Sequence, residues 1–195
     1  MIPSKPEVGL AGSALLKALA HRHDRYLRLI CNPVDRGAYI PYRDLAEPHT
    51  LACARALLES QSAMTLAPVD DQDQPYATPL FYFPGPDLSL CWLSSTDSRH
   101  SMNLRRHSHV SVAVYASVDR WEEIRRVQME GDVQEVSDAA ERREILAGYC
   151  RSFRLGTVLS LAIAWATLYR FRASWIRYLD NTHGFGYKVE LDLRS

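Results

Sequence analysis

The sequence of 195 residues is poor in cysteine, and its cysteines are scattered. Disulfide frameworks and zinc sites usually need closely spaced cysteines, and this chain contains no CxxC pair. Isolated thiols are typical of a protein in a reducing compartment, so we expect a cytoplasmic location. The 4 cysteines are Cys31, Cys53, Cys91 and Cys150.

Long apolar runs are also missing. A helix that crosses a bilayer needs about 20 apolar residues, and the longest run, around Val158–Trp165, is much shorter. The first residues do not combine a basic stretch with an apolar one, which is the pattern of a secretory leader. We therefore expect neither membrane association nor export.

An excess of charge is absent, because 23 basic residues balance 23 acidic ones. A chain of net charge 0 exerts no long-range attraction on nucleic acid. The basic stretch Arg99–Arg106 contains no aromatic side chain that could stack on a base. We expect no nucleic-acid partner.

The motifs of several enzyme classes are missing too. The glycines do not form the GxGxxG pattern of dinucleotide-binding domains, and no HExxH or Ser-His-Asp arrangement indicates a hydrolase. The spacing of His100, His107 and His109 does not place them on one face of a helix. We therefore expect no metal site.

Residues 1–45 differ in pattern from the rest of the chain. Pro33, Gly37 and Pro41 interrupt regular structure there, so we interpret this segment as an N-terminal extension. Residues 46–195 are enough for one domain, and 47% of the chain is hydrophobic, which allows a sizeable core.

Residues 46–195 contain short apolar runs that end at turn clusters such as Asp70–Pro75, the pattern of antiparallel strands. Apolar residues at helical spacing predict helices at Ala46–Ser60, from Ser137 onward with Ser137 as N-cap, and at Leu155–Ala166. We expect a mainly β or α+β fold with about six strands in a small barrel. The predicted strands are Met64–Val69, Tyr76–Phe83, Leu88–Leu93, Val110–Tyr115, Val127–Val136 and Leu168–Leu179.

Gly131 interrupts one of these predicted strands, Val127–Val136. A glycine inside a strand often marks a bulge, or a place where the backbone closely approaches a ligand. Both interpretations are open at the level of the sequence.

The segment Ser98–His107 places hydroxyl and cationic side chains together between two apolar runs, and we expect it to form a short helix. Hydroxyl donors, a guanidinium and the free N–H groups of a helix start are groups that bind phosphate. Ser98, Arg99 and His100 therefore indicate a phosphorylated ligand. The alternative for Ser98 is a role as helix cap alone.

The order and spacing of three segments resemble those of the FMN-binding split-barrel proteins of the pyridoxamine 5′-phosphate oxidase-like superfamily. The segments are Pro75–Leu80, Leu93–Leu104 and Arg126–Gly131. The resemblance covers roughly residues 47–190, and the ending Asp180–Lys188 is similar to that of a small, uncharacterised subgroup. It implies an antiparallel split β-barrel with peripheral helices.

The resemblance also implies a site for FMN. The strand at Ala77–Leu80 is expected to line the flavin ring, largely through backbone groups. The following strand end is expected to hold the ribityl chain, and the start of the short helix the phosphate. The matched residues are Ala77, Thr78, Pro79, Leu80, Ser94, Ser95, Ser98, Arg99, His100, Arg126 and Gln128.

His100 departs from the family pattern, because many members carry a lysine there. A lysine is charged at pH 7, whereas a histidine titrates near that pH. We expect phosphate binding to be weaker or pH-dependent, with Arg99 carrying more of it.

The resemblance favours an FMN-dependent oxidoreductase that forms a homodimer with the flavin at the subunit interface. The flavin carries the redox chemistry in such enzymes, so we expect no catalytic residue in the protein. Two alternatives are open: a non-catalytic protein that binds or stores flavin or haem, and a dimeric scaffold with an empty site. The small-molecule substrate and the electron donor cannot be derived from the sequence.

Overall fold

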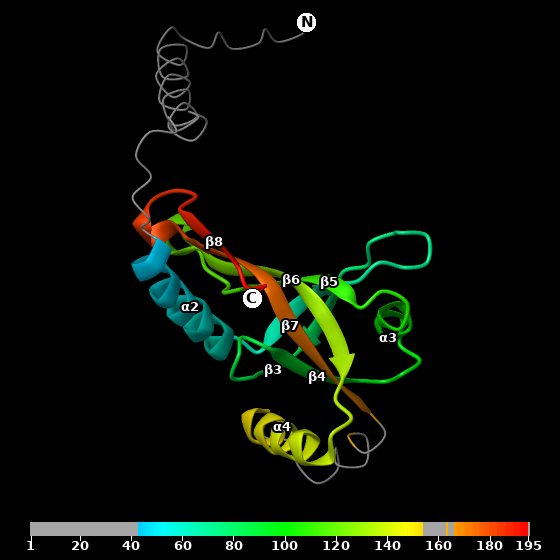
Figure 1. The fold of residues 1–195 in the computed structure, drawn as a ribbon. Coiled ribbons are helices and arrows are strands. Elements are labelled where there is room, and N and C mark those ends of the chain that lie inside the picture. The colour runs from blue at the N-terminus through cyan, green and yellow to red at the C-terminus, as the bar shows by residue number, and fades with distance from the viewer. Residues whose placement is uncertain (1–42, 154–162, 164–165, 195) are drawn as a thin grey trace, which may run out of the picture. The chain divides into compact units, whose positions relative to one another are not determined.

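The computed structural model describes residues 43–153, 163 and 166–194. Its strands form one antiparallel sheet in the order β2-β1-β5-β6-β7-β4-β3, which curls into a nearly closed barrel, and β8 pairs with β7 (Figure 1). The strands are β1 (Ala63–Ala67), β2 (Thr78–Phe81), β3 (Phe83–Pro84), β4 (Leu90–Ser94), β5 (His109–Tyr115), β6 (Arg125–Glu135), β7 (Thr167–Asp180) and β8 (Lys188–Asp192).

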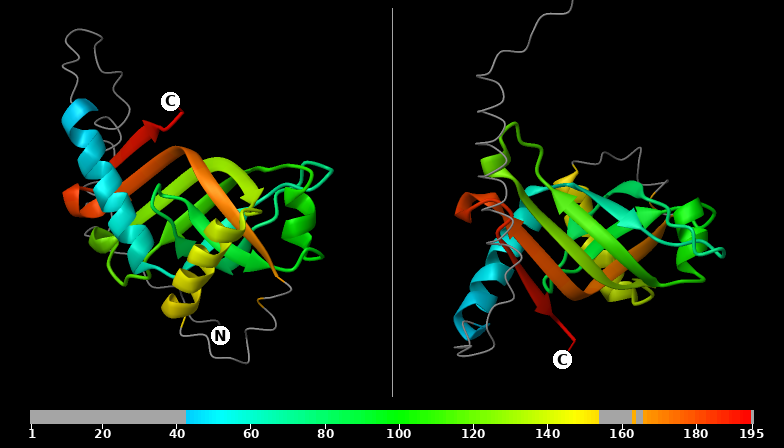
Figure 2. Two further views of the ribbon diagram at one scale, coloured as in Figure 1. Left: turned by 60° about the horizontal axis from the view of Figure 1, so that its bottom comes forward. Right: turned by 90° about the horizontal axis from the view of Figure 1, so that it is seen from above.

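Helices lie outside the barrel, with α2 and α4 along it and α3 beyond one end of the sheet (Figure 2). They are α2 (Arg43–Ser60), α3 (Arg99–Leu104), α4 (Ala139–Ser152) and the short 3₁₀ helices η1 (Trp121–Glu123) and η3 (Asn181–His183). The split β-barrel with peripheral helices that the resemblance implies is confirmed.

Alternation of apolar and polar residues positions the core. Val110, Val112 and Val114 of β5 point inward, while their neighbours in the strand are less buried. Leu57 and Leu58 of α2 lie in the same apolar core, so this helix covers part of the barrel with its apolar side.

The chain contains more strands than expected, because the predicted strand Tyr76–Phe83 is broken at Tyr82 into β2 and β3. These two strands form opposite ends of the sheet, so the chain passes round the corner of the barrel at this residue. Tyr82 is fully buried, and its hydroxyl donates to the carbonyl of Leu58 at 2.6 Å. Strand β8 was not predicted, since its short run Lys-Val-Glu-Leu-Asp contains only two apolar residues.

Of the two interpretations of Gly131, the structure shows the bulge. The register between β6 and β7 shifts between Glu130 and Gly131. A Cβ at Gly131 would lie 2.8 Å from the carbonyl carbon of Arg172 and 2.9 Å from Cα of Ala173. The close approach is therefore to the neighbouring strand of the same chain.

The predicted cap of the helix after Ser137 is wrong by one residue. Asp138 is the N-cap of α4, and its carboxylate accepts the N–H of Glu141 at 2.7 Å. The helix begins at Ala139, so the capping side chain must come from the residue immediately before it.

Two predictions fall on residues that the structure does not describe. The proposed extension over residues 1–45 lies almost wholly outside the described part, as does most of the predicted helix Leu155–Ala166. In the part that is described, no helix is long and apolar enough to span a bilayer.

Candidate cofactor site

The structure brings three of the predicted residues together where β4 ends and α3 begins. The Oγ of Ser94 lies 2.5 Å from Nε2 of His100 and 3.4 Å from Oγ of Ser98. The Oγ of Ser98 lies 3.1 Å from the same imidazole nitrogen. Ser98 is the N-cap of α3, since its Oγ accepts the N–H of Ser101; whether it also binds phosphate stays a prediction. We call Ser94, Ser98 and His100 the serine–histidine cluster.

His100 is buried inside this cluster, with 8% of its surface exposed. Burial lowers the pKa of its imidazole below the ordinary value of 6.5, because the charged form loses its hydration. The side chain is therefore neutral at pH 7. The position at which the resemblance led us to expect a lysine therefore carries no permanent positive charge in this chain.

Arg99 is turned toward the hairpin between β1 and β2. Its guanidinium lies 3.5 Å from the carboxylate of Asp70 and 4.4 Å from the ring centre of Tyr76. Hydrogen bonds from the N–H groups of Gln74 and Gln72 hold the pKa of Asp70 below its usual range, so this carboxylate is ionised at pH 7. More than half of the Arg99 side chain is exposed to solvent.

The stretch Ala77–Leu80 begins next to Tyr76, on which Arg99 is stacked. Its strand β2 ends the sheet order and pairs on one side with β1. Among the described residues, no strand pairs with the other edge of β2. The structure therefore places the predicted ring-binding stretch beside the helix that carries the predicted phosphate ligands.

The remaining predicted residues lie elsewhere. Ser95 is exposed, and its hydroxyl bonds to the carboxylate of Asp97. Arg126 and Gln128 are exposed on β6, which β1 and β5 separate from β2. Three strand spacings amount to about 14 Å, so the structure does not bring Gln128 to β2. Ser94 pairs with Thr167 of β7 whereas Gln128 pairs with Arg177 of the same strand, so about 30 Å along β7 separates Gln128 from the serine–histidine cluster.

A shallow depression of about 290 Å³ covers the outer face of β1, β5, β6 and β7. One row of register partners crosses this face, running from Thr65 through Ala113 and Gln128 to Arg177. Arg177 donates to Glu190 at 2.9 Å and lies 3.4 Å from the amide oxygen of Gln128. Ala67 of β1 and Ser111 and Ala113 of β5 have small side chains, so little side chain covers this part of the depression.

A family model described as pyridoxamine 5′-phosphate oxidase matches residues 52–179 of this sequence. The chain belongs to the pyridoxamine 5′-phosphate oxidase family. The match contains the hairpin, β2, the serine–histidine cluster and Gln128. The matched range therefore includes the predicted site residues.

Individual relatives agree with this family. A UPF0306 protein of Klebsiella pneumoniae is 28% identical over 141 residues, covering 72% of this chain and 91% of that protein. A heme-binding protein of Mycobacterium smegmatis superposes with a TM-score of 0.59 at 18% identity, covering 71% of this chain and 56% of its own. The heme storage protein HutZ of Vibrio cholerae gives 0.52 at 19% identity, covering 65% and 89%. At this identity the structural likeness shows the shared fold alone.

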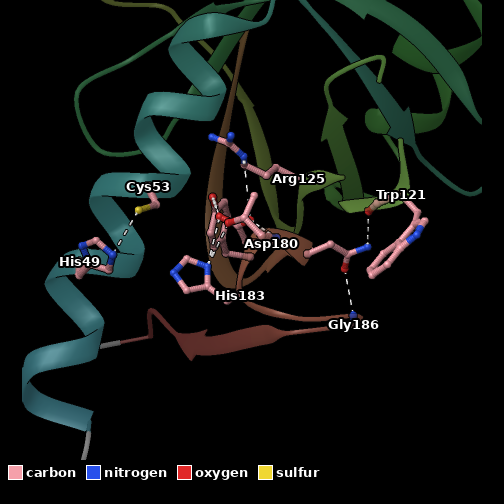
Figure 3. A network of polar contacts seen from close by, with 10 residues as sticks. His49, Cys53, Trp121, Arg125, Asp180, His183 and Gly186 are labelled. Atoms are coloured by element: carbon pink, nitrogen blue, oxygen red, sulfur yellow. Dashed lines mark hydrogen bonds and ion pairs between the residues drawn. The ribbon is translucent and has the colours of Figure 1, made fainter. Parts of the chain in front are cut away.

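The ending Asp180–Lys188 begins where the family match stops, and it forms a network of its own (Figure 3). The buried carboxylate of Asp180 accepts the hydroxyls of Tyr178 at 3.0 Å and Thr182 at 2.6 Å. Asn181 donates to the carbonyl of Trp121 at 2.7 Å and accepts the N–H of Gly186 at 2.9 Å. These bonds fix the turn between β7 and β8, so they give this motif a structural role.

Asp70 is the site residue that sequence reasoning missed. The sequence feature that could have indicated it is a pair of acidic residues, Asp70 and Asp71, that complements basic residues of the α3 segment. In the structure Asp70 faces Arg99, and Asp71 faces Arg106. Nothing in a linear sequence shows that two segments about thirty residues apart meet, because only the folded sheet brings this hairpin against α3.

Proposed function

We propose that this chain is an FMN-dependent oxidoreductase of the pyridoxamine 5′-phosphate oxidase family. The observation that carries the proposal is that Arg99, beside the serine–histidine cluster on α3, stacks on Tyr76, which directly precedes the Ala77–Leu80 stretch. Some members of this family bind flavin, which supports the choice of cofactor. When bound, FMN supplies the hydride or electron transfer.

The donor set suits FMN in all but one respect. Ser94 and Ser98 offer hydroxyls to the phosphate end, and Arg99 offers an exposed guanidinium. Asn103, three residues after His100 on α3, has a buried amide nitrogen with no hydrogen-bond partner among the described residues. A buried donor of this kind is usually satisfied by water or a ligand. The exception is His100, which brings no charge at pH 7.

A homodimer belongs to the same proposal. Arg126 and Gln128 lie too far from β2 to meet a flavin bound by their own subunit. They lie on or beside the open outer face of the sheet, so a second copy packed there can bring them to the flavin of its partner. The interface is supported further by the exposed aromatic ring of Tyr115, the register partner of Arg126.

The absorption spectrum of the purified protein tests the cofactor. We expect a flavin spectrum, with FMN released on denaturation and reduced by NAD(P)H while bound. Haem binding is the alternative, favoured by the heme-binding and heme storage proteins that share the fold and by the neutral imidazole of His100. A Soret band establishes that alternative, whereas a colourless protein that takes up neither added cofactor refutes both.

The pH dependence of FMN binding tests the role of His100. Phosphate beside the imidazole favours its charged form, so binding is coupled to uptake of a proton. We expect FMN affinity relative to riboflavin to rise more, or fall less, as the pH drops from 8 to 5.5 in the wild type than in a variant that cannot titrate at position 100. For the folding stability of the protein without FMN, a falling pH has the opposite effect and is unfavourable. The unfolded chain takes up the proton first, so stability falls as the pH drops below the ordinary histidine pKa of 6.5.

The matched control is His100→Gln, which keeps a neutral side chain of similar reach but cannot titrate. FMN's own phosphate titrates near pH 6 and contributes equally in both proteins. The difference between the two pH profiles, measured by fluorescence titration, therefore belongs to His100. Identical profiles for the wild type and the variant exclude His100 from the phosphate site.

A further inference from the structure

We propose that a groove at the corner of the barrel binds a planar, uncharged aromatic small molecule. The groove has a volume of about 530 Å³ and lies where the chain passes from β2 to β3. This volume falls within the range of small-molecule sites. Its described lining residues are Glu59, Ser60, Gln61, Ser62, Phe81, Tyr82, Phe83, Pro84, Ser152 and Phe153.

Aromatic rings form the walls of the groove. Phe81 on β2 and Phe153 at the end of α4 meet edge to face, with ring centres 5.5 Å apart. Phe153 in turn contacts Tyr149 of α4, with ring centres 4.6 Å apart. Edge-to-face rings leave a ring face and a ring edge free, so a further flat ring can stack on the face or meet the edge.

The walls are held in place from behind. The ring of Phe83 packs directly on Gly148 of α4, so closely that a Cβ there would lie 2.7 Å from a ring carbon. Tyr82 is anchored by its hydrogen bond to Leu58 of α2. By contrast, 61% of Phe81 is exposed, although it is a large apolar side chain. A ligand that stacks on Phe81 removes this apolar surface from water while the rest of the wall is already ordered.

The charge of the lining decides which molecules fit. Among the described lining residues, Glu59 is the only carboxylate, and none is a lysine, arginine or histidine. Gln61, Ser62 and Ser152 add neutral hydrogen-bonding groups at the rim. A phosphate ester, such as the compound named in the family description, meets a carboxylate here instead of a cation. The carboxylate therefore disfavours an anionic ring system, while the neutral hydrogen-bonding groups and aromatic walls suit an uncharged one.

The location links this groove to the proposed cofactor site. Phe81 directly follows Leu80, the last residue of the stretch expected to line the flavin ring, in the same strand. Alternation along β2 places Phe81 on the same outer face as Pro79. The assignment of the groove as the substrate's site rests on the proposed function, whereas binding of an aromatic molecule there does not.

Titration with two matched probes tests the proposal on the full chain, with and without FMN. The probes are 2-naphthol, which is flat and neutral at pH 7, and 2-naphthalenesulfonate, which differs by a fixed negative charge. We expect 2-naphthol to bind at least tenfold more tightly. We also expect Phe81→Ala to weaken 2-naphthol binding by about three- to tenfold, the contribution of one stacked ring.

Phe185→Ala is the matched control, because it removes the same ring from a side chain that is 65% exposed in the turn between β7 and β8. This control should leave the titration unchanged. In Glu59→Gln, the affinity for 2-naphthalenesulfonate should rise toward that of 2-naphthol. Equal binding of the two probes by the wild type, or equal losses in Phe81→Ala and Phe185→Ala, overturns the assignment. Absence of FMN binding refutes the cofactor proposal and leaves this result standing.

Discussion

Replacing Arg99 with alanine is expected to weaken FMN binding by about 10- to 100-fold. His100 is neutral at pH 7, so the guanidinium of Arg99 is the described permanent cation nearest the serine–histidine cluster along the chain. A hydrogen bond to a charged group contributes about 1.5–3 kcal/mol, which corresponds to this loss of affinity. Fluorescence titration with FMN and riboflavin measures it, and only the FMN affinity should fall.

Arg106→Ala is the matched control for this experiment. Arg106 pairs with Asp71 of the same hairpin, as Arg99 does with Asp70, but it follows the end of α3. The control therefore removes an equal charge and an equal link to the hairpin. A similar loss of FMN affinity in both variants shows a general charge effect and rules out a specific phosphate contact at Arg99.

Asp70→Asn is expected to act in the opposite direction. Asparagine keeps an oxygen that can accept the N–H groups of Gln72 and Gln74, so the turn is preserved. The charge that competes with phosphate for Arg99 is removed, and FMN affinity should increase by up to about fivefold. This gain must disappear in the double variant with Arg99→Ala, because the two residues act through the same contact.

Gly131→Ala is expected to be the most destabilising single substitution proposed for this chain. The new methyl group meets backbone atoms of Arg172 and Ala173, which belong to the longest strand, β7, and cannot rotate away as a side chain can. Such overpacking costs about 3 kcal/mol, so the midpoint of thermal unfolding should fall by about 10 °C. Differential scanning calorimetry at pH 7.5 measures the shift.

Glu130→Ala provides the comparison for Gly131→Ala. Glu130 is the neighbouring residue of the bulge, and its side chain is exposed on the outer face of the sheet. Its removal should change the unfolding temperature by less than about 2 °C. If Gly131→Ala is as stable as this comparison, β6 and β7 do not approach as closely as the structure shows.

The sequence was sufficient for most of the secondary structure because alternation and helical spacing are local properties. The core positions Val110, Val112 and Val114 follow directly from alternation with polar neighbours in β5. Local signals were insufficient at Tyr82, because it lies within the apolar run Leu80–Phe83, which hides the corner of the barrel. The position of that corner depends on the carbonyl of Leu58, which lies 24 residues away in α2.

In the candidate site, too, local features could be predicted from the sequence and long-range contacts could not. The family resemblance placed Ser94, Ser98 and His100 in one site, and the structure brings them together because a strand end and the start of the following helix are close along the chain. The sequence could not place Arg126 and Gln128, because their distance from β2 is set by the strands that lie between them in the sheet.

The amino-acid sequence by itself determined the family, the alternation that builds the barrel and the replacement of an expected lysine by His100. Only the tertiary structure decided the electrostatics of the site. It buries His100, which lowers the pKa of the imidazole, and it turns Arg99 toward Asp70 on a distant hairpin. The physical reason is that burial and ion pairing depend on which segments pack together, and a hairpin and a helix about thirty residues apart meet only when the sheet has formed.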